Sequence, residues 1–150
     1  MDALLTVIIL WLSANFGLPA NYEHPRVEFV PPSKIVALRY RGLSGLQAPA
    51  AAGTALPGQR EAVAVYDVAT KTIFLRDDWS GKSPADLSVL VHEVVHHLQA
   101  LGKLKFECPQ EREQLAFTAQ EKWLNLFGTN LEREFEIDPF TLLVTTKCMH

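Results

Sequence analysis

The fold of this chain is decided by the stretch from Ser83 to Gly102, which reads SPADLSVLVHEVVHHLQALG. Its apolar residues recur at helical spacing, so it predicts one buried amphipathic helix. Ser83 can cap the amino end, Pro84 suits the first helical position, and Asp86 completes a capping box with Ser83. Gly102 can end the helix.

Within this helix, residues 92–96 form an HExxH motif. Residues four apart lie on one face of a helix, so His92 and His96 can present nitrogen atoms to the same metal ion. Glu93 is offset round the helix and can reach a water bound to that ion. Zinc accepts such ligands and keeps one position open for water in catalytic sites. The motif therefore predicts one Zn²⁺ per chain, with Glu93 as general base. The alternative is a pair of hydrogen-bonded core histidines.

The neighbouring sequence limits where a third protein ligand can lie. The extended HExxHxxGxxH arrangement is excluded, because Gln99 and Gly102 stand where it needs glycine and histidine. The other common arrangement takes a glutamate from a following helix. Periodicity predicts such a helix over residues 109–127, ended by Gly128.

His97, the residue after the motif, points away from the helix face that carries His92 and His96. This direction predicts that His97 is a surface residue or a hydrogen-bond partner of a ligand rather than a ligand itself.

Glu113 is the predicted third ligand. It is the only acidic residue on one face of the second helix, which consists of Glu113, Ala116, Phe117, Gln120, Trp123, Leu124 and Phe127. A carboxylate on an apolar face is costly unless it is paired or binds a metal. A salt-bridged carboxylate is the structural alternative at this position, and Glu111 and Glu107 are the alternative ligands.

These motifs resemble those of the gluzincin branch of zinc metallopeptidases. The likeness rests on residues 92–96 and on Glu113-Gln114-Leu115-Ala116, which is similar to the Glu-x-x-Ala of that branch's glutamate helix. The chain more closely resembles a family of small bacterial HExxH proteins without an assigned function. Its matching segments are Trp11-Leu12-Ser13-Ala14-Asn15, residues 90–99 and residues 108–123. This closer likeness covers most of the chain and implies no substrate.

Length and composition favour one folded domain over residues 1–150. Hydrophobic residues make up 48% and charged residues 21%, as in ordinary globular proteins. The net charge of -3 offers no basic surface for nucleic acid. Residues 42–60 are rich in Gly, Ala and Pro and predict a long mobile loop.

The first 20 residues can be interpreted in two ways. Their apolar run has the length of a signal-peptide core, and Leu18-Pro19-Ala20 is similar to a weak cleavage site. However, Asp2 replaces the expected positive charge, and the apolar pattern continues through Phe16. We favour a structural helix of the mature domain, too short to span a membrane. A signal segment further upstream would fit the same pattern.

Two cysteines, Cys108 and Cys148, suggest a disulfide that joins the tail to the start of the second helix. A disulfide favours a periplasmic or exported location over the cytoplasm. The alternatives are two reduced thiols, or Cys108 as a zinc ligand.

The remaining pattern predicts an α+β fold. Residues 27–30 form a strand, Ser33 caps a short helix, and residues 62–66 and 72–75 form a hairpin. Asp138-Pro139 begins a last element, either helix or strand. The order of N-terminal helix, small three-stranded twisted sheet, zinc helix and glutamate helix is that of a minimal zincin-like domain.

The predicted activity is zinc-dependent hydrolysis of a peptide or protein, with a hairpin strand holding the substrate. Two alternatives remain: a zinc hydrolase of another amide or ester, and a zinc-stabilised interaction domain without turnover. A fourth ligand such as Cys108 or His97 would favour the latter. The candidate donors for the oxyanion are Tyr66, Tyr40, His24 and His97. The sequence predicts no oligomeric state.

Overall fold

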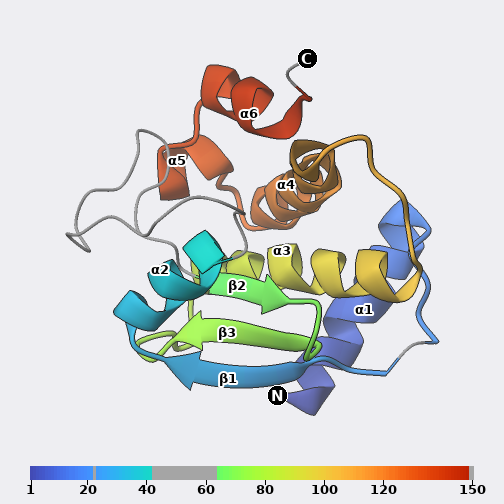
Figure 1. Ribbon diagram of the computed structural model, residues 1–150. Helices are drawn as coiled ribbons and strands as arrows, with labels where there is room; N and C mark the ends of the chain where they lie inside the picture. The colour runs from blue at the N-terminus through green and yellow to red at the C-terminus, as the bar shows by residue number, and fades with distance from the viewer. Residues whose placement is uncertain (22, 42–63, 149–150) are drawn as a thin grey trace.

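The computed structural model describes residues 1–21, 23–41 and 64–148, and the loop predicted over 42–60 lies outside this part. Within it, helices surround a small mixed sheet with the strand order β1-β3-β2 (Figure 1). The strands are β1 (Arg26–Val30), β2 (Ala64–Asp67) and β3 (Thr72–Arg76). β3 pairs parallel with β1 and antiparallel with β2. The predicted α+β class is confirmed, and so is the hairpin.

The central strand β3 buries side chains on both faces of the sheet. Ile73 and Leu75 are fully buried in the main core, whereas Phe74 packs on the opposite face with Ile35 of α2 (Pro32–Arg41). This alternation follows from the two-residue period of a strand. One detail of the prediction is wrong: α2 begins at Pro32 rather than after Ser33, because the Pro31 carbonyl already accepts a helical N–H.

The main core lies between the sheet, α1 (Asp2–Phe16) and α3 (Pro84–Leu101). In α1, Leu5, Ile8 and Leu12 are buried against this core, and Figure 1 shows α1 crossing behind the sheet beside α3. Each such side chain contributes about 1.5–3 kcal/mol when removed from water. Loss of α1 would therefore expose part of this core. No helix of the described ranges is long and apolar enough to cross a bilayer.

At the start of α3, one of the two hydrogen bonds of the predicted capping box is formed. The Ser83 hydroxyl accepts the Asp86 N–H at 3.0 Å, as predicted. The Asp86 carboxylate does not return to Ser83. It accepts the N–H groups of Ser80 and Gly81, each at 3.1 Å. The loop after β3 therefore supplies the donors that satisfy Asp86, and the sequence pattern alone did not indicate this.

Beyond α3, α4 (Pro109–Leu126) packs along α3 on the side away from the sheet (Figure 1). A short α5 (Leu131–Phe135) follows, and then α6 (Pro139–Thr146), which is capped by Asp138 and lies over α4. The tail is thus a helix. Cys108, the N-cap residue of α4, forms a disulfide with Cys148, with 5.8 Å between the Cα atoms. The predicted pairing is present in the structure.

Candidate metal centre

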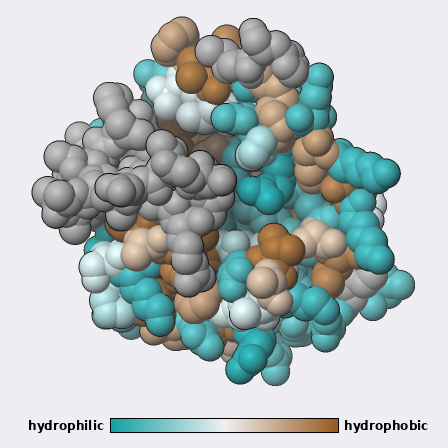
Figure 2. Space-filling view, viewed as in Figure 1, coloured by the Kyte–Doolittle hydropathy of each residue, from teal (hydrophilic) through white to brown (hydrophobic). Residues whose placement is uncertain are grey.

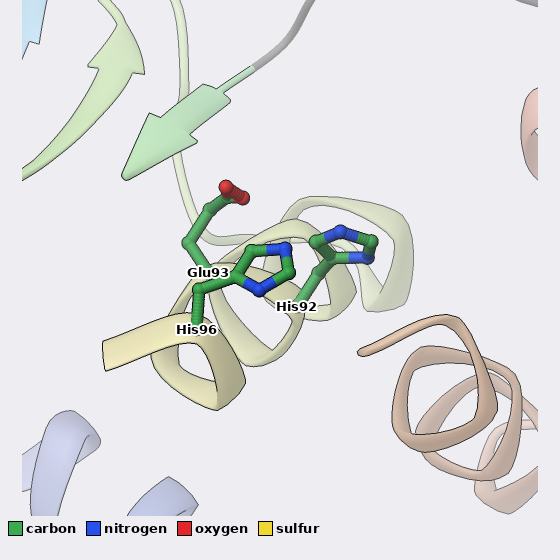
Figure 3. Close-up of side chains that lie close together, drawn as sticks. All are labelled: His92, Glu93 and His96. Atoms are coloured by element: carbon green, nitrogen blue, oxygen red, sulfur yellow. The ribbon is translucent and has the colours of Figure 1, made fainter. Parts of the chain in front are cut away.

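His92, Glu93 and His96 lie on the middle turns of α3 and are buried. The two imidazole rings stand on the same side of the helix, with their centroids 5.0 Å apart (Figure 3). The Glu93 carboxylate extends toward β2. One potential ligand atom from each of the three residues lies within 4.8 Å of the other two. The structure therefore places the HExxH side chains as the helical spacing predicts.

The packing of α4 on α3 brings Glu113 to the two histidines. Its Oε2 atom lies 2.8 Å from His92 Nε2, and its Oε1 atom lies 3.0 Å from His96 Nε2. The small buried residues Ala116 and Ala119 of α4 allow this close approach of the two helices. One carboxylate thus contacts both rings.

Glu111 and Glu107, the alternative ligands, lie elsewhere. The Glu111 carboxylate accepts the backbone N–H of Glu107, and both carboxylates lie close to Cys148. The helix-face argument that selected Glu113 over these two residues agrees with the structure.

The distances from the Glu113 oxygens to the two imidazole nitrogens can be compared with those of a tetrahedral metal site. Zinc bonds of about 2.0–2.1 Å to nitrogen and oxygen place neighbouring ligand atoms about 3.3 Å apart. The distances from Glu113 to the two imidazole nitrogens are a few tenths of an ångström shorter. Two histidines and one carboxylate are also an established donor set for zinc. His92, His96 and Glu113 could therefore hold zinc after a small outward movement.

Charge and burial act in opposite directions within this cluster. Burial tends to raise the pKa of Glu113, but the hydrogen bonds from His92 and His96 outweigh it and hold that pKa below its usual value. Burial tends to lower the pKa of His96, but the contact with Glu113 prevails and raises it. Without a metal, an ionised carboxylate thus faces imidazole N–H groups, and a cation could replace their protons.

The second nitrogen of each ring contacts a glutamine side chain, and the sequence pattern did not predict that either glutamine belongs to the site. His92 Nδ1 lies 2.9 Å from Gln120 Oε1, and His96 Nδ1 lies 2.9 Å from Gln99 Oε1. Metal-binding histidines usually donate their second ring N–H in this way. The sequence spacing could have indicated both contacts. Gln99 follows His96 by three residues, and Gln120 shares the face of α4 that carries Glu113.

Comparison with protein families matches residues 1–150 to a domain of unknown function, DUF6647. The chain belongs to the DUF6647 family. No curated protein and no solved structure matches it.

His97 of this DUF6647 chain has a different role from the one predicted. It is fully buried rather than exposed, and its Nδ1 and Nε2 atoms lie 2.8 Å from the Tyr66 hydroxyl and from the Glu23 carbonyl. The carbonyl can only accept, so Nε2 donates to it and Nδ1 accepts from Tyr66. His97 therefore joins α3 to β2 and to the segment before β1. The prediction that it is a surface residue is wrong.

The same bonds bear on the candidate oxyanion donors. The Tyr66 proton is directed to His97, and burial raises the pKa of Tyr66 to about 12. His24 contacts Thr6 and Asp2 of α1 instead of the HExxH face. The Tyr40 side chain lies outside the described part. Cys108 cannot be a zinc ligand while it is in the disulfide, and both His97 nitrogens are occupied.

Proposed function

We propose that this chain is a zinc-dependent metallopeptidase in which His92, His96 and Glu113 bind the metal and Glu93 is the general base. The observation that carries the proposal is the convergence of both Nε2 atoms on one carboxylate, at 2.8 and 3.0 Å. The gluzincin-like order of an HExxH helix and a glutamate helix supports the same assignment. So does the occupation of Cys108 and His97 by other partners, because neither can then fill a fourth position.

Bound zinc would supply an acidified water molecule and a Lewis acid for a carbonyl oxygen. Glu93 is offset from the face that carries the imidazole rings and extends toward β2 (Figure 3), so its carboxylate could accept a proton from that water molecule. It can then return this proton to the nitrogen of the leaving amine. The role requires a carboxylate near the ligand atoms that is not itself needed as a ligand, and Glu93 meets this requirement.

The edge strand β2 gives a reason to favour a peptide as substrate. β2 is hydrogen-bonded to β3 on one side and packs on α3. Among the described residues no strand pairs with its other edge, and an extended peptide could bind there through main-chain hydrogen bonds, which do not depend on the peptide's sequence. Phe117 lies against His92, with ring centroids 4.6 Å apart, and adds an apolar surface beside the ligands. Substrate side chains can contact that surface.

The first test is the metal content of the purified protein. We expect about one zinc per chain, lost in His92→Ala and in His96→Ala. Full zinc occupancy in both variants would refute the site.

The second test is cleavage of a broad peptide library, followed by mass spectrometry. Glu93→Gln removes the base and keeps the shape, so zinc content and folding should persist while turnover falls by about 10²- to 10⁴-fold. Glu111→Gln is the matched control, because Glu111 lies on the neighbouring helix away from the histidines, and it should retain full activity. A zinc-loaded protein that cleaves esters or other amides but no peptide would favour the broader hydrolase. One that cleaves nothing would favour a zinc-stabilised interaction domain.

A further inference from the structure

The glutamine contacts behind the two histidines belong to longer hydrogen-bonded chains with a defined direction. The first chain runs within α3 and across to α4. The Ser88 hydroxyl lies 2.8 Å from the Ala85 carbonyl, and Gln120 Nε2 lies 3.1 Å from the Ser88 oxygen. A carbonyl can only accept, so Ser88 donates its proton to Ala85 and accepts from the Gln120 amide. The Gln120 oxygen must then face His92, whose Nδ1 donates to it.

The second hydrogen-bonded chain also makes the Nδ1 atom of its histidine, His96, a donor, but it runs through other residues. Gln99 Nε2 donates to the Arg112 carbonyl of α4 at 3.2 Å. Its amide oxygen is thereby directed to His96 Nδ1, which must donate. Gln99 and Gln120 are almost completely buried, at 1% and 4% exposure, so water does not compete for these bonds. Each chain ends at a backbone carbonyl, which cannot reverse its role.

A neutral imidazole has a single N–H group, and its position decides which nitrogen can bind a metal. When Nδ1 carries the proton, Nε2 keeps its lone pair. In this structure both Nε2 atoms face Glu113. If a metal ion replaced the Nε2 protons that face Glu113, the two hydrogen-bonded chains would keep the remaining proton of each ring on Nδ1, so that both Nε2 lone pairs would point to the common centre.

We propose that Gln99 and Gln120 are positioning residues that fix this tautomer, and that Ser88 orients the Gln120 amide in turn. This inference rests on the proposed zinc site. Under this proposal, three groups of α4 support the metal centre: the Glu113 carboxylate, the Gln120 amide and the Arg112 carbonyl. Zinc binding and the packing of α4 on α3 are then coupled.

The experiment measures zinc affinity by competition with a chromophoric chelator. We expect Gln99→Leu and Gln120→Leu to weaken binding by about 10- to 100-fold, the range for loss of such hydrogen-bond partners. Ser88→Ala should weaken it by about 3- to 10-fold, because one hydrogen bond that orients the amide is lost. Gln120→Glu keeps an acceptor oxygen and should stay near the wild-type affinity.

Two matched controls separate this effect from general damage. Gln114→Leu changes an exposed glutamine of α4, and Thr118→Ala removes a hydroxyl that donates to a helix carbonyl as Ser88 does. Both should bind zinc as the wild type does. The visible absorption bands of the Co²⁺-substituted protein report ligand geometry directly. They should change in Gln99→Leu and Gln120→Leu and stay constant in the controls.

The outcomes distinguish this inference from the zinc site itself. If His92→Ala retains zinc, the site is wrong. If His92→Ala loses zinc but Ser88→Ala and both leucine variants bind zinc as tightly as the wild type, the site stands and the tautomer inference is overturned. Where a leucine variant does not fold, the comparison of Ser88→Ala with Gln120→Glu decides, because equal and unchanged affinities would refute the role of the Gln120 amide.

Discussion

Removal of the disulfide by the double substitution Cys108→Ser and Cys148→Ser should destabilise the domain by about 4 kcal/mol. The bond closes a loop with a sequence separation of 40. In the chain-entropy treatment, a loop of this length costs the unfolded chain about 13 cal/mol/K, which is about 4 kcal/mol at 25 °C. For a domain of this size, the midpoint of thermal unfolding should fall by about 10 °C.

The assay is urea unfolding of the wild type with and without a reductant, beside the double variant in the same two conditions. Reduced wild type and double variant should agree with each other, and the variant should not respond to the reductant. A difference below about 1 kcal/mol between oxidised wild type and variant would refute the reasoning. Two free thiols in the mass spectrum of natively exported protein would refute the pairing and its support for an exported location. The zinc content of the folded variant should equal that of the wild type. Loss of zinc from the folded variant would indicate that one of the two cysteines is a ligand.

Three further substitutions test individual contacts. Glu113→Ala should greatly weaken zinc binding in a metal titration while Glu111→Ala should not, and the reverse pattern would move the ligand by half a turn of α4. Gly81→Ala should cost more than the about 1–2 kcal/mol expected for a left-handed residue alone, since its Cβ would lie 2.7 Å from the Trp79 ring. Gly17→Ala, at a similar φ but with open space around it, is the control, and equal losses in urea unfolding would exclude a steric term. Tyr66→Phe should lower stability by about 1–3 kcal/mol, because it leaves the buried His97 Nδ1 without a donor, and zinc affinity should stay constant. A stability equal to that of the wild type would show that this bond contributes little.

Local signals predicted the two long helices well. Ser83, Pro84 and Gly102 bound the first helix as expected, and the predicted second helix differs from α4 by one residue at its end. Helical spacing also predicted that His92, His96 and Glu113 lie together, as they do, because a face of a helix is determined by a few residues of sequence. These parts of the site needed no knowledge of distant segments.

Features that depend on distant segments were missed or wrong. His97 is buried because β2 and the Glu23 carbonyl cover it, and nothing near residue 97 indicates either partner. The parallel pairing of β1 with β3 places Arg26 opposite Thr72 and was not predicted. In the sequence, Gln99 served only to exclude the extended HExxHxxGxxH arrangement. In the structure, its amide donates to the Arg112 carbonyl and its oxygen contacts His96. Such roles become visible only when the helices are packed.

The short connection between α3 and α4 bears on the order in which this domain can fold. All three proposed ligands and both supporting glutamines lie on one helical hairpin, whose two members are joined only by residues 102–108. Contacts that are local in sequence form early, whereas the pairing of β1 with β3 and the packing of α1 on α3 must close long loops. The hairpin can therefore gather its polar side chains before the sheet is complete. A nascent chain that meets zinc at this stage would gain binding energy while most of its core is still unformed.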